Sequence, residues 1–300
     1  MKNVTEYLNS GSIKQQNKKR LGALLICATA ILLCIALLIF TVASITAAIR
    51  NRKANEEPED DNGIPTGYTT TMLDVTQISQ GTLLLIDDMH PCMIEPEVVS
   101  ITDRPTIPDS TSAVYSAYMD LCFVTKDTLT ALNKMMADFY AATQNDCVYL
   151  TKTEHGTILT LTYYDEATNT KTNSIYDAEA KAPVEEYRWI FTNAATYGFV
   201  PAYDTEGKEN VFRYVGAEHA KAMDALNADN FPEYLEALKA RCGQPGSARS
   251  VTVEGVRYKI YYQAATADTP VWVPEKNTYV VSGNNVDGYI ITETVSTNKK

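Results

Sequence analysis

The longest apolar run in the chain extends from Leu21 to Ile49 and contains 29 residues without a charge. As a helix it would be about 43 Å long, whereas the hydrocarbon layer of a bilayer is about 30 Å thick. The pattern therefore predicts a transmembrane helix over 21–49, preceded by a polar tail over 1–20. The alternative is a cleaved signal peptide, whose apolar core would be only about 7–15 residues long.

The charges that flank this run indicate its orientation. Five basic residues precede it and three follow it, which favours a cytoplasmic N-terminus and an extracellular C-terminal part. We therefore expect a single-pass protein of the cell membrane. Residues 50–77 are charged and have few apolar anchors, so they are predicted to be a flexible linker.

Helical spacing of apolar residues recurs at four places in the remainder of the chain. It predicts helices over about 128–143, from Glu185 to a stop at Gly198, over about 217–227 and over about 231–241. Thr125 or Asp127 can cap the first of these. The second carries one apolar stripe made of Tyr187, Ile190, Phe191, Ala194 and Ala195.

Strand patterns lie between these helices and after them. Runs rich in β-branched and aromatic residues predict strands over 81–87, 147–150, 157–164 and 211–215. Residues 165–183 are polar and are expected to form a loop. After a boundary at 243–247, alternation around Glu254 and Gly255 predicts one hairpin, and 279–292 reads as a second.

The charge of the chain excludes one class of function, and the cysteines leave the alternatives open. Residues 1–53 hold 8 of the 26 basic residues and 1 of the 37 acidic ones, so the remainder has a net charge of −18. Such an acidic domain is not expected to bind nucleic acid, because phosphates would repel it. Four cysteines lie outside the apolar run: Cys92, Cys122, Cys147 and Cys242. Their spacing does not match the paired spacing of metal-binding cysteines, and the sequence is equally compatible with one disulfide or with free thiols.

Two blocks in the middle of the chain resemble the VanY-type zinc D-alanyl-D-alanine carboxypeptidases. The family pattern is roughly W-x-x-x-N-A-x-x-Y-G-F, followed by E-P-W-H-x-R-Y-V-G and a nearby H-A. The first block is matched by Trp189, Asn193, Ala194, Tyr197, Gly198 and Phe199. The second is matched by Arg213, Tyr214, Val215, Gly216, His219 and Ala220.

The resemblance implies an α+β fold in which helices pack on a small antiparallel sheet, as in VanY- and Hedgehog-like D,D-peptidases. It places the carboxypeptidase-like domain at 78–242, with residues 81–87 as its opening strand. Residues 248–296 are similar to the small β-module that follows some members of the family.

The zinc site that the family implies is incomplete in this sequence. A hydrolytic zinc needs about three protein ligands, an open position for water and a base. The family positions fall on His155, which can bind metal, and on Thr162 and Val211, which cannot hold zinc well; the base position falls on Lys208. We therefore expect no catalytic residue and no cofactor, with zinc only if the protein is active.

Other residues do not restore the site in the sequence. Asp165 should point to the opposite face of its strand from Thr162, His219 fills a position where the family also has a non-ligating histidine, and His90 lies in a proline-rich segment. The family arginine that would meet a peptide carboxylate is also missing. A possible cleft would be lined by Glu154, Arg213 and Tyr214, although for Arg213 and Tyr214 a structural role is favoured over contact with a ligand.

These observations leave three hypotheses for the function of the protein. The favoured hypothesis is a membrane-anchored extracellular pseudoenzyme that acts as a binding or regulatory module at the cell wall, with a peptidoglycan stem peptide or a cell-wall protein as its partner. The alternative is an active zinc carboxypeptidase that trims the terminal D-alanine of stem peptides through an unusual ligand set. The third is an unrelated extracellular interaction domain.

Overall fold

A computed structural model of the 300-residue chain describes residues 65–118, 120–203, 205–266 and 270–295. All described residues belong to one compact unit, which begins at Glu57. The predicted tail, the predicted membrane segment and most of the linker lie outside the described residues. Within the described ranges, no helix has the length and apolar character needed to cross a bilayer.

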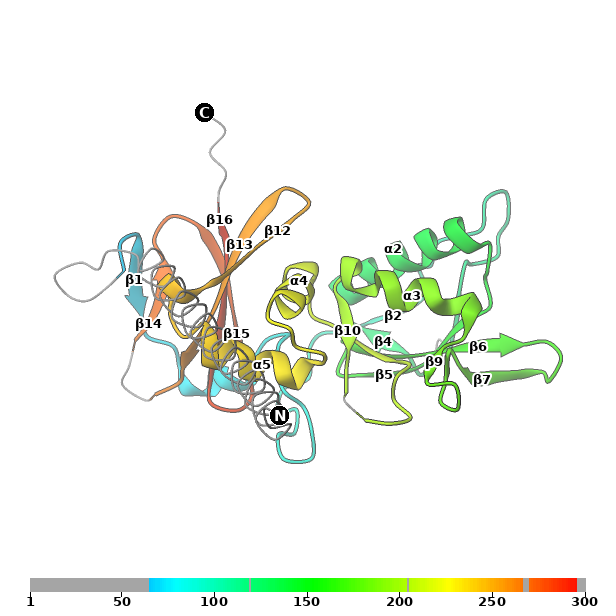
Figure 1. Cartoon of the computed structure of the whole chain (residues 1–300), viewed down its shortest axis with the longest axis horizontal. Coiled ribbons are helices and arrows are strands. Elements are labelled where there is room, and N and C mark those ends of the chain that lie inside the picture. The colour runs from blue at the N-terminus through cyan, green and yellow to red at the C-terminus, as the bar shows by residue number, and fades with distance from the viewer. Residues whose placement is uncertain (1–64, 119, 204, 267–269, 296–300) are drawn as a thin grey trace, which may run out of the picture. The chain divides into compact units, whose positions relative to one another are not determined.

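Residues 116–214 form a mixed sheet with helices on it (Figure 1). The strands are ordered β10–β11–β6–β5–β3, with β7 also paired to β6, and all pairs are antiparallel except β3 with β5. Their bounds are Ser116–Ala117 (β3), Val148–Glu154 (β5), Ile158–Asp165 (β6), Thr170–Ser174 (β7), Phe199–Pro201 (β10) and Val211–Tyr214 (β11). Strand β7 lies inside the segment that was expected to be a loop.

Two helices, α2 (Lys126–Thr143) and α3 (Arg188–Asn193), contribute to the core of this sheet. Leu132, Met135, Met136 and Phe139 of α2 are fully buried, together with Leu150 and Leu161 of the sheet. The Thr125 hydroxyl accepts a hydrogen bond from Thr128 N and caps α2, as one of the two expected caps.

The predicted helix from Glu185 to Gly198 is confirmed as a helical segment, but it is divided. A 3-10 turn over Glu185–Tyr187 precedes α3, and another over Ala194–Tyr197 follows it. Gly198 ends the segment with φ of +84°, and a Cβ there would lie 2.7 Å from the carbonyl carbon of Gly216. Only glycine fits this left-handed position without a clash.

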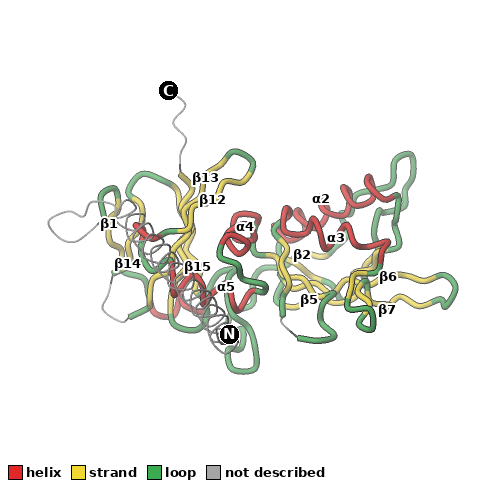
Figure 2. The backbone as a smooth tube through the Cα atoms, in the orientation of Figure 1, coloured by secondary structure: helices red, strands yellow, loops and turns green. Residues whose placement is uncertain are grey.

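A second sheet follows in the chain, as the two predicted hairpins require (Figure 2). Its order is β12–β13–β16–β15, with bounds Arg249–Val253, Val256–Ala264, Gly288–Val295 and Thr278–Gly283. Helices α4 (Ala217–Ala225) and α5 (Phe231–Arg241) share a buried core with it, through residues such as Met223, Leu238 and Ile260.

Shorter pairs complete the architecture. They join β1 (Tyr68–Thr71) to β14 (Val271–Pro274), β2 (Val99–Ser100) to β4 (Phe123–Val124) and β8 (Tyr176–Asp177) to β9 (Ala182–Pro183). The C-terminal end of the predicted linker is therefore structured, since Tyr68 is buried against Tyr261.

The expected strand over 81–87 does not form. Leu83 and Leu84 are buried, but this segment hydrogen-bonds through Leu83 N to Ser282 Oγ and through Leu85 N to Asn284 O instead of joining a sheet. Gly81, with φ of +118° and its Cα packed on Ser282, interrupts the extended backbone at the start of the segment. The fold as a whole is nevertheless of the mixed α+β class that the sequence predicted.

Candidate functional site

His155 lies at the tip of the hairpin that joins β5 to β6. His155 and Gly156 have φ of +50° and +68°, and Thr157 N donates to Glu154 O. Two consecutive left-handed residues are typical of a type I′ turn, which matches the twist of the flanking strands. A Cβ on Gly156 would lie 3.0 Å from both Thr125 and Val98, so the turn is held close to the start of α2 and to the preceding loop.

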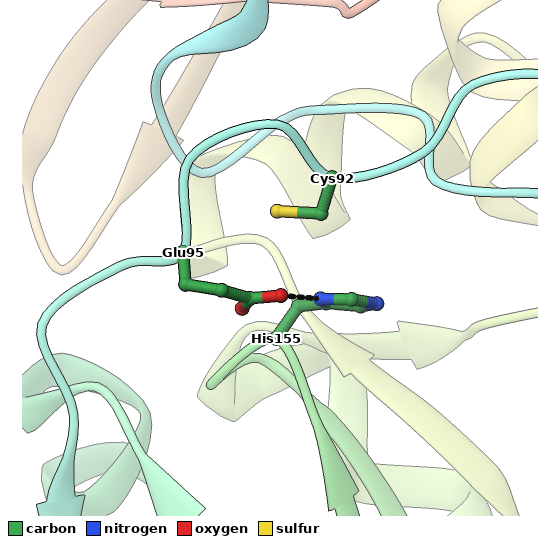
Figure 3. Close-up of side chains that lie close together, drawn as sticks. All are labelled: Cys92, Glu95 and His155. Atoms are coloured by element: carbon green, nitrogen blue, oxygen red, sulfur yellow. Dashed lines mark hydrogen bonds and ion pairs between the residues drawn. The ribbon is translucent and has the colours of Figure 1, made fainter.

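The loop before β2 brings two further metal-ligand side chains to His155 (Figure 3). The ligand atoms of Cys92, Glu95 and His155 all lie within 4.8 Å of one another. Glu95 Oε1 is 2.8 Å from His155 Nδ1, and Cys92 Sγ donates to Ile94 O at 3.3 Å. The side chain of Glu95 is 62% exposed and that of His155 is 27% exposed, so the group is open to solvent on one side.

No set of residues that could replace the missing donors stands out in the sequence, and the structure brings this group of three together at His155. Cys92 is a free thiol in the structure, as are Cys122, Cys147 and Cys242. Burial and the neighbouring Glu95 carboxylate raise the pKa of Cys92, while the charge of Arg213 acts in the opposite direction. In the absence of a cation, Cys92 therefore remains protonated at neutral pH.

The family carboxylate position, Thr162, makes no contribution to this group. Its side chain is buried, and its Oγ1 lies 3.1 Å from Tyr149 O and 2.8 Å from Lys171 O. The hydroxyl has one proton, which it can donate to the carbonyl of β5 or to that of β7. A hydroxyl engaged in this way is not placed to bind a metal.

The third family position, Val211, lies in an apolar cluster with Ile158, Ala202 and Tyr203. Val211 is 9% exposed and pairs with Thr160 across β11 and β6. The base position, Lys208, is exposed, and its ammonium group lies 4.4 Å from the centre of the Tyr203 ring. The residues at the family positions therefore do not fit a catalytic zinc, since hydrocarbon and a cation stand where donors and a base would be needed.

The three residues of the expected cleft are placed differently from one another. Glu154, at the end of β5, is half-buried and pairs with Lys152 at 2.5 Å. Arg213 is 3% exposed, donates to Thr82 O and stacks 3.9 Å over the centre of the Phe231 ring. Tyr214 packs against Phe199 in the core. Of the three, Glu154 is accessible at the surface near His155.

The buried position of Arg213 has an electrostatic consequence. Its Nε has no hydrogen-bond partner, and no carboxylate accepts from its guanidinium in the described part of the chain. Burial lowers the pKa of Arg213 to about 10. Arg213 is therefore a cation supported by a carbonyl and an aromatic face, with Cys92 and Tyr203 as the neighbouring titratable groups.

The other two histidines do not belong to the group. His90 lies 2.9 Å from Asp87 within its own turn. His219 is buried and links Tyr234 Oη, 2.8 Å from its Nδ1, to Thr292 Oγ1, 2.9 Å from its Nε2. Burial lowers the pKa of His219 to about 3, so its ring is neutral and joins α4 to α5 and β16.

No pattern in the sequence places Cys92 and Glu95 beside His155, because their proximity depends on a long-range contact. Sixty positions separate Glu95 from His155, and no local pattern fixes how the proline-rich segment folds back. The C-x-x-E spacing of Cys92 and Glu95 was the available signal. Taken alone, one thiol and one carboxylate at that spacing are not specific for a metal site.

The sequence of the chain is similar to that of a known protein over part of its length. A curated D-alanyl-D-alanine carboxypeptidase of Enterococcus faecium is 36% identical over 115 residues, which amount to 36% of this chain and 36% of the relative. The match thus spans about a third of the length of that relative. No protein-family model matches the chain.

Solved structures provide a comparison of the fold. The vancomycin-resistance D,D-dipeptidase VanXYg, solved in complex with a D-Ala-D-Ala phosphinate analog, aligns with a TM-score of 0.56 at 20% identity, covering 76% of this chain and 99% of its own. The LdcB LD-carboxypeptidase aligns with a TM-score of 0.34 at 16% identity, covering 49% and 81%, which is too weak to support an argument. The chain is therefore homologous to a D-alanyl-D-alanine carboxypeptidase over part of its length, as the two sequence blocks predicted, and it has a mixed α+β fold like that of a VanXY D,D-dipeptidase.

Proposed function

We propose that this protein is a non-catalytic relative of the D-alanyl-D-alanine carboxypeptidases that binds peptidoglycan stem peptides. The observation that carries the proposal is the position of Val211 in the apolar cluster with Ile158 and Ala202. A hydrolytic zinc cannot be held where a ligand is replaced by hydrocarbon and a second position, Thr162, is engaged with backbone carbonyls. The partial homology to a carboxypeptidase supports the choice of peptide.

The proposal includes the location of the protein. The uncharged run Leu21–Ile49 and the excess of basic residues before it support a single membrane anchor with the C-terminal part outside the cell. In that location the domain would meet peptidoglycan directly. A cell-wall protein is the second partner that this location would allow.

The Cys92, Glu95 and His155 group favours a second candidate, a peptidase that uses a different set of donors. Three protein donors and an open position are the usual composition of a catalytic zinc site. Against this candidate, the base position is Lys208, whose ammonium group lies on the Tyr203 ring and cannot accept a proton.

Binding and turnover can be separated in one experiment. The full chain, purified in detergent with zinc present, is titrated with a stem pentapeptide that ends in D-alanyl-D-alanine, and free D-alanine is measured in the same samples. We expect saturable binding without D-alanine release. A tetrapeptide that lacks the last D-alanine serves as the control for recognition of the terminus.

Each result has a distinct meaning. Binding without release supports the non-catalytic proposal, and release that requires zinc supports the second candidate. Absence of binding to either peptide contradicts both, and would favour a protein partner at the cell wall.

A further inference from the structure

We propose that Cys92, Glu95 and His155 form a binding site for a single thiophilic divalent cation of the zinc class. This site differs from the position that the family resemblance implies, because only His155 is common to the two. The proposal goes beyond the proposed function, since a metal that joins a loop to a hairpin requires neither turnover nor a bound peptide.

The donor set matches the chemistry of zinc. Zinc binds cysteine sulfur, histidine nitrogen and carboxylate oxygen, whereas calcium and magnesium require oxygen donors. The three atoms already lie within 4.8 Å of one another. Because the Glu95 side chain is 62% exposed, a water molecule can reach a fourth position.

The rearrangement required differs between the donors. Cys92 Sγ lies within 4.8 Å of the other two donor atoms and would have to come to about 3.5 Å from each, since zinc–sulfur bonds are about 2.3 Å long. For the other pair the change is small. With zinc–ligand bonds of about 2.0 Å, nitrogen and oxygen donors of a tetrahedral site are about 3.3 Å apart. His155 Nδ1 and Glu95 Oε1 are 2.8 Å apart, joined by a hydrogen bond. A cation between them would replace this hydrogen bond and widen the separation by about 0.5 Å, which a change in side-chain torsions can supply.

The charges balance when the cation binds. Binding removes the proton from the Cys92 thiol, so one thiolate and one carboxylate offset the two positive charges and one proton passes to solvent. His155 binds as the neutral ring. In the metal-free protein, burial and the Glu95 carboxylate raise the pKa of Cys92, and the charge of the nearby Arg213 only partly offsets this. The cation must therefore displace the thiol proton for the neutral complex to form.

The backbone holds the two sides of the site in place. Gly156 is packed against Pro96 and Val98 from the loop, and Gly156 O accepts from Thr125 N at the start of α2. The His155 tip therefore faces the segment that carries Cys92 and Glu95, as Figure 3 shows. Preorganisation of this kind reduces the entropy lost when the cation binds.

The experiment uses the full chain in detergent, stripped of metal and titrated with zinc chloride or cobalt chloride alone. We expect one equivalent of metal per chain, with a thiolate-to-cobalt charge-transfer band in the near ultraviolet. Cys92→Ser and His155→Ala should each weaken zinc binding by more than about tenfold. The circular dichroism of each variant shows whether it is folded.

Matched controls are present in the same chain. Cys147 lies 3.9 Å from a carboxylate oxygen of Asp146, and His90 lies 2.9 Å from Asp87, but neither belongs to the group of three. Cys147→Ser and His90→Ala should therefore bind zinc like the unmodified protein. In addition, zinc should protect Cys92, but not Cys147, from alkylation, which tests the site without any substitution.

The proposal is overturned if metal binds below one equivalent per chain, if the control variants weaken binding as much as Cys92→Ser does, or if zinc leaves the alkylation of Cys92 unchanged. These readouts do not involve peptide. Failure of the metal site and failure of stem-peptide binding are thus distinguishable.

Discussion

His155 Nδ1 lies 2.8 Å from Glu95 Oε1, although sixty positions separate the two residues in the sequence. This contact joins the tip of the β5–β6 hairpin to the loop that precedes β2. It also means that the histidine matched to the family's first ligand faces a carboxylate and a thiol from outside the family pattern. The positions matched to the other two ligands, Thr162 and Val211, are engaged elsewhere.

The Glu95–His155 pair allows a prediction about stability with and without zinc. Glu95→Gln should change the free energy of unfolding of the metal-free protein by less than about 1 kcal/mol, because the Glu95 side chain is 62% exposed. Saturating zinc should stabilise the unmodified chain, by about 2.7 kcal/mol at one hundred times the dissociation constant, and should stabilise the variant less. Denaturant unfolding measures both quantities. Equal stabilisation of the two proteins by zinc would contradict the role given to Glu95.

Thr162 provides a test of how far the family site has diverged. Its hydroxyl lies within hydrogen-bonding distance of Tyr149 O and Lys171 O, and an aspartate has no proton to donate to either. Thr162→Asp should therefore lower the free energy of unfolding by roughly 1–3 kcal/mol. Thr162→Ser keeps the hydroxyl and should be less destabilised. The interpretation would be wrong if the aspartate variant were as stable as the serine variant.

Combining Thr162→Asp with Val211→His and Lys208→Glu rebuilds the three family positions. If these positions correspond as the sequence blocks imply, the triple variant should bind zinc even when Cys92 is replaced by serine. Metal analysis after dialysis checks this. A triple variant that remains metal-free while folded would show that the backbone no longer brings these positions together.

Two glycines with left-handed backbones separate steric from conformational effects. Gly198 and Gly207 have φ of +84° and +82°, but a Cβ would lie 2.7 Å from Gly216 at the first and would meet nothing within 4 Å at the second. Gly207→Ala should reduce stability by about 1 kcal/mol through backbone strain alone. Gly198→Ala should reduce it by at least about 1 kcal/mol more, because the helical segment and the strand β11 region are in direct contact there. Thermal unfolding measures the loss of stability in both variants. Equal losses would contradict this prediction.

His219 predicts a dependence of stability on pH. Burial lowers its pKa to about 3 in the folded protein, whereas an unfolded histidine has a pKa of about 6.5. Above pH 6.5 both states are neutral; below it the unfolded state takes up a proton that the folded state does not. Stability is therefore lost as the pH falls from about 6.5 toward 3, by up to about 1.4 kcal/mol per unit from this residue.

The variant His219→Gln can hydrogen-bond to Tyr234 and Thr292 but does not titrate. It should show a flatter dependence of the free energy of unfolding on pH between 6.5 and 4 than the unmodified protein. Parallel curves for the two proteins would mean that His219 takes up a proton in the folded state as well.

Several elements could be predicted because their signals are local. The spacing of apolar residues gave α2, α4 and α5 almost to the residue, and the turn at Glu254 and Gly255, both with positive φ, gave the β12–β13 hairpin. The mixed α+β class was implied by the resemblance that the two sequence blocks carry. The expected strand over 81–87 failed because a run of leucines is equally suited to an extended segment that packs without pairing in a sheet.

Only part of the candidate site could be predicted from the sequence. The resemblance to the VanY-type carboxypeptidases singled out His155 and placed Thr162 and Val211 at the other two ligand positions. Cys92 and Glu95 could not be assigned to the same place, because their proximity to His155 is set by packing of Pro96 and Val98 against Gly156. Contacts of this kind form only in the tertiary structure, and the spacing of apolar residues along the sequence does not predict them.

We propose that this chain binds stem peptides without hydrolysing them, because Thr162, Val211 and Lys208 stand where zinc ligands and a base would be needed. The most direct test incubates the full chain, saturated with zinc, with a stem pentapeptide and measures free D-alanine over time, beside a boiled sample. We expect no release above the boiled sample while the intact pentapeptide remains bound. Release of D-alanine that is removed by chelation and restored by zinc would contradict the claim.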